Sequence, residues 1–260
     1  MGMEMWWREY ELSANAWARW QIGPLLLFTR YGPGEWEFMW HRDPDPMASS
    51  SSFSSPSPVE PDPEDHESRR YALRQTSALL NLRPRLADRP VIARPASPLH
   101  IPPNQETTLY VSTVVWLNAL SEDIVLLEMP IHRPSDTWFG SDTISGELCY
   151  ASRTQARTSS DLLNHLPHRA ITPIVIVNEA GTPLQVEQLR VPVPFLSLYA
   201  SPEGHLWTES IRLARGADST EASLELLGGG SLPAECQRVA EPREAAPRHS
   251  LVRSFSRLFD

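Results

Sequence analysis

Lysine is absent from this chain of 260 residues, so all 23 basic residues are arginine. A chain without lysine has no phosphate-loop lysine and no kinase lysine. It also cannot form a Schiff base with a carbonyl or pyridoxal cofactor, or a Ser-Lys dyad. The absence therefore excludes several large classes of enzyme.

Positive charge of any kind is scarce. The 23 basic residues are outnumbered by 32 acidic ones, and the formal net charge is −9. A protein that binds nucleic acid needs a basic face to displace counterions, and no stripe of basic and aromatic residues supplies one. We therefore expect no nucleic-acid partner.

Cysteine and long apolar runs are equally scarce. The two cysteines, Cys149 and Cys236, are far apart, so they cannot form a cysteine-rich zinc site. One disulfide is possible, but a reduced cytosolic state is the simpler interpretation. No run approaches the ~20 apolar residues of a membrane-spanning helix, and residues 1–10 lack the apolar run of a signal peptide. We expect a cytoplasmic protein without a transmembrane segment.

Proline, in contrast, is abundant, with 25 residues, which argues against a helical bundle. Short runs of β-branched and aromatic residues alternate with turns rich in glycine and proline. Trp36, Phe38 and Trp40 alternate with Glu35, Glu37 and Met39, and residues 107–120 form the strongest candidate strand. The sequence predicts a mainly β fold, an antiparallel β-sandwich or barrel-like domain, with a few short helices such as residues 159–166.

Composition divides the chain into five segments. Residues 1–42 supply N-terminal strands, and residues 70–215 form the main β domain. Between them, residues 43–69 are rich in serine, proline and acid, and we expect a disordered insertion. Residues 216–249, with three consecutive glycines, resemble a flexible tail. Residues 250–260 are expected to form an amphipathic helix.

The apolar face of this C-terminal helix consists of Leu251, Phe255, Leu258 and Phe259. Three surfaces could receive it: the chain's own domain, a partner subunit, or an anionic membrane surface. Ten residues are too few for strong membrane binding alone, so any membrane contact through this face is expected to be weak.

Residues 132–150 are the most unusual segment, because large aromatic side chains accompany the small polar residues of a loop. We expect this segment to fold back onto the domain and to hold any binding site. The candidate binding residues are His132, Asp136, Trp138, Asp142, Glu147 and Cys149.

None of these residues forms a catalytic or metal-binding signature. On a strand, Glu128 and His132 would lie about 13 Å apart at roughly 3.3 Å per residue, too far to share an ion. Asp136 and Asp142 fit self-bonded turns. Cys149 fits a buried structural cysteine, because no activating base is identified. We predict no catalytic residue, no metal and no cofactor.

Several blocks of the chain resemble a prokaryotic family known only as domain of unknown function 432. The resemblance is carried mainly by residues 135–140 (SDTWFG) and 146–151 (GELCYA), and also by residues 89–103, 110–113 and 193–199. It covers residues 15–42 and 70–215, and it implies that the ordered parts form one unit in which residues 43–69 are an insertion. The family carries no established activity, so the resemblance implies no function.

Two hypotheses about function remain open, and the sequence does not decide whether the chain is an enzyme. The first is a non-enzymatic cytosolic interaction or accessory module that binds a protein partner, including a membrane-associated one. The alternative is a small-molecule or carbohydrate-binding protein, or a hydrolase, with its site in residues 132–150.

Overall fold

The computed structural model describes residues 5–140, 146–152, 154–216, 222–228, 232–246 and 251–252. Over these residues the protein is mainly β, as the sequence predicts, with strands in five sheets. The helix predicted over residues 159–166 is only a 3₁₀ turn, η1 (Ser160–Leu162). Ser159 caps it, as a serine at this place should, but Leu163 is already extended and the helix cannot continue.

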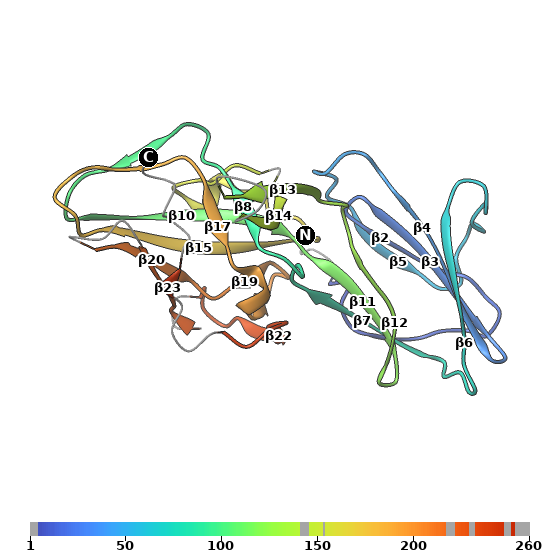
Figure 1. Cartoon of the computed structure of the whole chain (residues 1–260). Coiled ribbons are helices and arrows are strands. Elements are labelled where there is room, and N and C mark those ends of the chain that lie inside the picture. Colours follow the sequence, from blue (N-terminus) through green and yellow to red (C-terminus); the bar gives the residue numbers. More distant parts are fainter. Residues whose placement is uncertain are drawn as a thin grey trace.

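The N-terminal half is a β-sandwich (Figure 1). One of its sheets has the order β5-β2-β3-β4-β6, made of β5 (Ser51–Ser54), β2 (Ala18–Ile22), β3 (Leu25–Gly32), β4 (Glu35–Arg42) and β6 (Glu67–Ala72). The other has the order β1-β7-β11-β12, made of β1 (Glu9–Glu11), β7 (Leu79–Arg85), β11 (Trp116–Ser121) and β12 (Ile124–Pro130). Aromatic residues join the two sheets: the ring of Tyr10 meets that of Trp20 edge-on, with 5.1 Å between the centroids.

The predicted alternation of β4 is confirmed. Trp36, Phe38 and Trp40 are all buried between the two sheets. Met39 is also buried, so this strand is covered more fully than a simple alternation requires.

The predicted disordered insertion is wrong in part. Within residues 43–69, β5 pairs with β2, and β6, which begins at Glu67, pairs with β4, so both complete the first sheet as its two edges. An edge strand needs a backbone partner on one side only, and Phe53 is the one large side chain that β5 packs against the core. Composition alone therefore underestimates how much order pairing can impose.

The C-terminal half is built around two long antiparallel strands, β10 (Gln105–Val114) and β15 (Arg169–Asn178). Around β15 runs a sheet ordered β22-β18-β19-β15-β20-β21-β23, made of β22 (Gln237–Ala240), β18 (Leu198–Ala200), β19 (Leu206–Thr208), β15, β20 (Ile211–Arg215), β21 (Ala222–Leu226) and β23 (Leu251–Val252). A smaller sheet is ordered β13-β14-β8-β17, made of β13 (Ser135–Phe139), β14 (Glu147–Ala151), β8 (Val91–Ala93) and β17 (Leu189–Val191). The remaining elements are β16 (Leu184–Val186), paired with β9 (Leu99–Ile101), and η2 (Val193–Phe195).

Most pairs of strands are antiparallel, as predicted, but β14 pairs with β8, and β15 with β19 and β20, in parallel. The predicted strand over residues 107–120 is divided at Val115 between β10 and β11. Its two parts belong to different sheets, so this run connects the two halves (Figure 1). The largest hydrophobic cluster extends through both halves and includes, for example, Trp20 of β2 and Ile174 of β15.

The predicted tail is also more ordered than expected. Residues 216–249 contain β21 and β22, which pair with β20 and β18 respectively. Leu251 and Val252 form β23 against β21, so the predicted helix over residues 250–260 does not begin where the pattern placed it. Phe255, Leu258 and Phe259 lie outside the described residues. No helix in the described part of the chain is long and apolar enough to cross a membrane.

Candidate functional site

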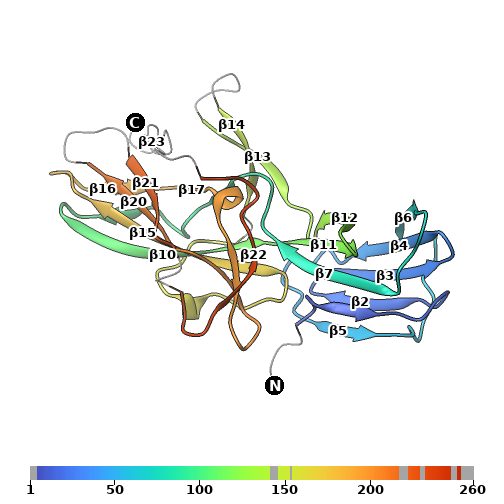
Figure 2. The ribbon, with the colours of Figure 1, turned by 90° about the horizontal axis from the view of Figure 1, so that it is seen from below.

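The predicted segment forms a hairpin of β13 and β14 that projects from the body of the protein (Figure 2). Asp136 and Trp138 lie in a strand, whereas the sequence indicated a loop for this segment. Directly opposite them across the hairpin are Tyr150 and Leu148. Because neighbours along a strand point to opposite faces, Asp136 and Trp138 share one face and Cys149 the other.

On the second face Glu147 and Cys149 are both held in place. Arg190 donates from Nε and Nη2 to the two carboxylate oxygens of Glu147, at 2.6 and 2.8 Å. The Cys149 side chain is fully buried, and its burial, together with the charge of Glu147, raises the pKa of the thiol to about 11. At neutral pH this thiol is protonated, so it is a poor nucleophile.

On the first face two apolar side chains reach solvent. Trp138 and Leu148, which face each other across the hairpin, are 38% and 40% exposed. The indole of Trp138 lies against Gly146, where a β-carbon would overlap its Nε1. Beside them, Asp136 forms an ion pair with Arg89, with 3.4 Å between Oδ1 and Nη1. The face therefore combines an apolar centre with a charged border.

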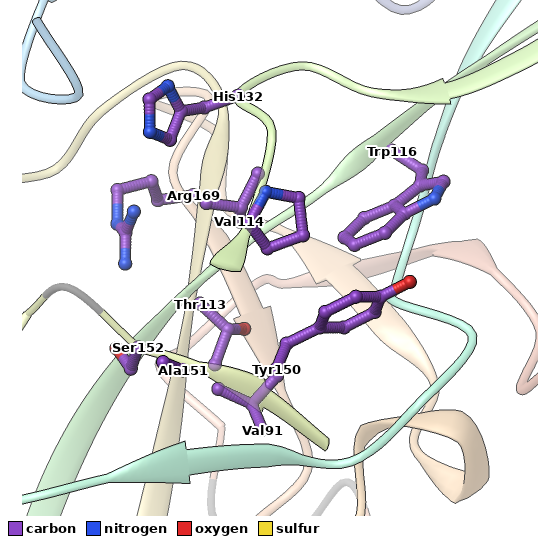
Figure 3. Close-up of a pocket in the computed structure, with 10 residues that line it drawn as sticks. Val91, Thr113, Val114, Trp116, His132, Tyr150, Ala151, Ser152 and Arg169 are labelled. Atoms are coloured by element: carbon purple, nitrogen blue, oxygen red, sulfur yellow. The ribbon is translucent and has the colours of Figure 1, made fainter. Parts of the chain in front are cut away.

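His132 precedes the hairpin in the chain and is buried at the edge of a small cavity that Tyr150 of β14 also lines (Figure 3). The cavity has a volume of about 20 Å³, the space of roughly one water molecule. Its lining includes Thr113, Trp116, His132, Tyr150, Ser152 and Arg169. Of the six predicted residues only His132 contributes to it, and Asp142 lies outside the described residues.

Arg169 is the unexpected member of this cavity, because it is a buried cation that no acidic side chain among the described residues pairs with. Its guanidinium donates from Nε to the hydroxyl of Ser112 at 2.8 Å, and from Nη2 to the Ser112 carbonyl at 2.6 Å and to Thr154 Oγ1 at 3.1 Å. It forms no salt bridge with any residue that the structure describes. Burial lowers its pKa to about 10, so it remains charged at neutral pH.

Sequence reasoning missed Arg169 because the cavity draws its residues from separate strands. Thr113, Trp116 and Arg169 come from β10, β11 and β15 respectively. The only local signal is an arginine directly before the apolar run that starts at Ala170. Among the described residues no group of three His, Cys, Asp or Glu side chains is placed to hold a metal ion.

These features define a mainly β protein with a projecting hairpin and a buried arginine beside a small cavity. The chain belongs to the family described as "Protein of unknown function (DUF432)", whose model matches residues 6–260. No curated protein and no solved structure matches the chain. The match confirms the resemblance of the sequence to this family and also spans residues 43–69, which the resemblance left out.

Proposed function

We propose that this chain is a non-enzymatic interaction module that binds a protein partner through strand β13 and the Trp138–Leu148 pair. The observation that carries the proposal is the place of this pair: two large apolar side chains lie opposite each other on a projecting hairpin, and both are more than one third exposed. Tryptophan is among the residues that most often dominate the binding energy of protein interfaces.

The backbone of β13 supports the same proposal. It is the outer strand of its sheet, and no strand in the described residues pairs with its free edge. An exposed edge can accept an extended segment of another protein as an additional strand, with side-chain pockets or anchors supplying specificity. The partner would present such a segment, with an apolar side chain that packs on Trp138.

Support for the alternative, a hydrolase or small-molecule site in residues 132–150, is weaker. Glu147 and Cys149 are separated from Asp136 and Trp138 by the hairpin itself. The carboxylate of Glu147 already accepts hydrogen bonds from Arg190, and the Cys149 thiol is protonated at neutral pH. The side chains do not converge on one reacting atom.

The experiment compares the full-length chain with two variants during affinity purification from its native cell. Trp138→Arg places a charge in the centre of the proposed surface, whereas the control Leu162→Arg changes a side chain that is 64% exposed elsewhere. A protein that is retained by the wild type and by Leu162→Arg should be lost from Trp138→Arg, and its cross-links should map to β13. Equal retention by all three, with Trp138→Arg folded as judged by circular dichroism, would contradict the proposal.

A cytoplasmic location and a membrane-associated partner belong to the same proposal. The apolar pattern of Phe255, Leu258 and Phe259 supports the membrane-associated partner, with Leu251 now assigned to β23. Ending the chain after Val252 keeps this strand and removes the pattern. We expect the shortened protein to be absent from the membrane fraction of lysed cells. Unchanged fractionation would contradict the membrane-associated partner but would not bear on partner binding by the hairpin.

A further inference from the structure

A polar groove of about 340 Å³ lies between the two halves of the protein, far larger than the cavity beside Arg169. One wall is formed by β7 and β11 and the other by β22, which lies beside β7 (Figures 1 and 2). The first wall contributes Arg83, Arg85 and Asn118, and the second contributes Arg238 and Glu241.

Strand register explains why these polar groups converge. Arg83 of β7 lies opposite Asn118 of β11, which in turn lies opposite Glu128 of β12. Residues that face each other across neighbouring strands point to the same side of a sheet, and Arg85 joins them two positions along β7. The other side chains of β7, such as Leu80 and Leu82, are buried in the core.

Positive charge exceeds negative charge around this groove, although the chain as a whole carries −9. The groove is lined by three guanidinium groups (Arg83, Arg85 and Arg238) and one carboxylate, that of Glu241. Glu128 pairs with both Arg85 and Arg243, and Glu241 pairs with Arg238. The side chain of Arg83, an exposed residue, has no ion pair or hydrogen bond with any residue in the described part of the chain.

Asn118 provides an independent indication of a ligand. Its side chain lines the groove, yet the residue is only 6% exposed, and Oδ1 has no hydrogen-bond partner among the described residues. Buried polar atoms in folded proteins are nearly always hydrogen-bonded, so an exception needs an explanation. Oδ1 is an acceptor, so a bound molecule that presents a hydroxyl or N–H donor would satisfy it.

We propose that this groove binds a small molecule with a dianionic phosphate group: Arg83 is the principal contact of the phosphate, and Asn118 Oδ1 accepts a hydrogen bond from a hydroxyl group of the same molecule. The planar fork of arginine matches the oxygens of a phosphate group. The volume lies at the lower end of the roughly 300–1,000 Å³ usual for ligand sites, which fits a phosphate ester of a small sugar. The site is separate from the β13–β14 hairpin and does not depend on the proposed partner.

Isothermal titration of the full chain tests the proposal with four probes: ribose 5-phosphate, inorganic phosphate, ribose and a single-stranded oligonucleotide. Arg83→Gln removes an exposed charge that supports no other contact, so the variant should fold normally. Arg74→Gln, a change of another exposed arginine outside the groove, is the matched control. We expect Arg83→Gln to weaken phosphate binding at least tenfold and Arg74→Gln to change it less than twofold. Ribose should not bind, and added salt should weaken binding by the wild type.

The probes also distinguish two sources of the phosphate group. Tighter binding of ribose 5-phosphate than of inorganic phosphate, with the difference lost in Asn118→Ala, assigns the groove to a phosphate ester. Equal binding of both assigns it to free phosphate. The proposal is overturned if neither binds, if binding is the same in Arg83→Gln and in the wild type, or if a single-stranded oligonucleotide binds more tightly than ribose 5-phosphate.

Discussion

The imidazole of His168 lies directly against Gly23, in the interior of the protein. A β-carbon on residue 23 would overlap Nδ1 of His168 and approach its Cε1 to 2.8 Å. The other nitrogen, Nε2, donates a hydrogen bond to the carbonyl oxygen of Pro46 at 3.1 Å. One ring therefore fixes three segments that are far apart in the sequence, and one of them belongs to the region expected to be disordered.

The close approach predicts that Gly23→Ala destabilises the protein. Gly23 has a φ of +53°, which costs an L-residue about 1–2 kcal/mol. Overlap with the His168 ring adds roughly 1–3 kcal/mol. We expect urea unfolding to show a total loss of about 2–5 kcal/mol. Gly181→Ala is the control, because a β-carbon there meets no atom within 4 Å; similar losses in both variants would refute the explanation.

Burial of His168 predicts that stability falls with acid. Desolvation, followed by the charge of Arg169, lowers the pKa of His168 from 6.5 to about 3. Below pH 6.5 the His168 side chain is therefore protonated in the unfolded chain, whereas in the folded protein it stays neutral down to about pH 3. The free energy of unfolding consequently decreases as the pH falls from 6.5 to 3. Between pH 7 and pH 5 the loss should be about 2 kcal/mol.

Urea unfolding at both pH values measures this loss. His168→Gln should remove most of the pH dependence, whatever its effect on stability at pH 7. His100→Gln, which changes an exposed histidine, should keep the pH dependence of the wild type. If the free energy of unfolding of His168→Gln depends on pH as strongly as that of the wild type, other groups titrate between pH 7 and pH 5.

The β-sandwich was predictable where a strand buries one face, and not where pairing alone decides. The alternating sequence pattern predicts that Trp36 and Phe38 are buried, because every second side chain of such a strand enters the core. The strand that contains Phe53 lacks this signal, since it occupies an edge and is surrounded by serine. Order there depends on backbone hydrogen bonds to β2, which composition does not record.

Convergence of side chains was not predictable, for a different reason. The groove brings Arg83 and Asn118 together with Arg238, which is more than 100 positions away. No local pattern marks such residues, because their meeting depends on strand order and register. Within the predicted segment, the sequence located the exposed Trp138, but it could not show that Glu147 points to the other face of the hairpin.

The contacts of Arg169 predict that even a change to lysine is costly. Lysine keeps the charge but cannot donate to the Ser112 hydroxyl, the Ser112 carbonyl and Thr154 in the fixed geometry of a guanidinium. We expect Arg169→Lys to lower the free energy of unfolding by about 1–3 kcal/mol. Arg74→Lys, at an exposed site, should change it by less than about 0.5 kcal/mol. Equal stability of both variants would mean that the hydrogen bonds of Arg169 contribute little.

The pKa of Cys149 predicts a thiol that resists alkylation in the folded protein. With a pKa of about 11 in place of 9.0, its thiolate fraction at pH 8 falls roughly a hundredfold. The side chain is also fully buried, so iodoacetamide reaches the thiol only when the protein opens locally. Mass spectrometry of timed reactions should therefore show Cys149 modified at least 100 times more slowly in the folded protein than in urea. Rapid modification of Cys149 in the folded protein would show that the thiol is exposed and activated. The hairpin would then again be a candidate catalytic site.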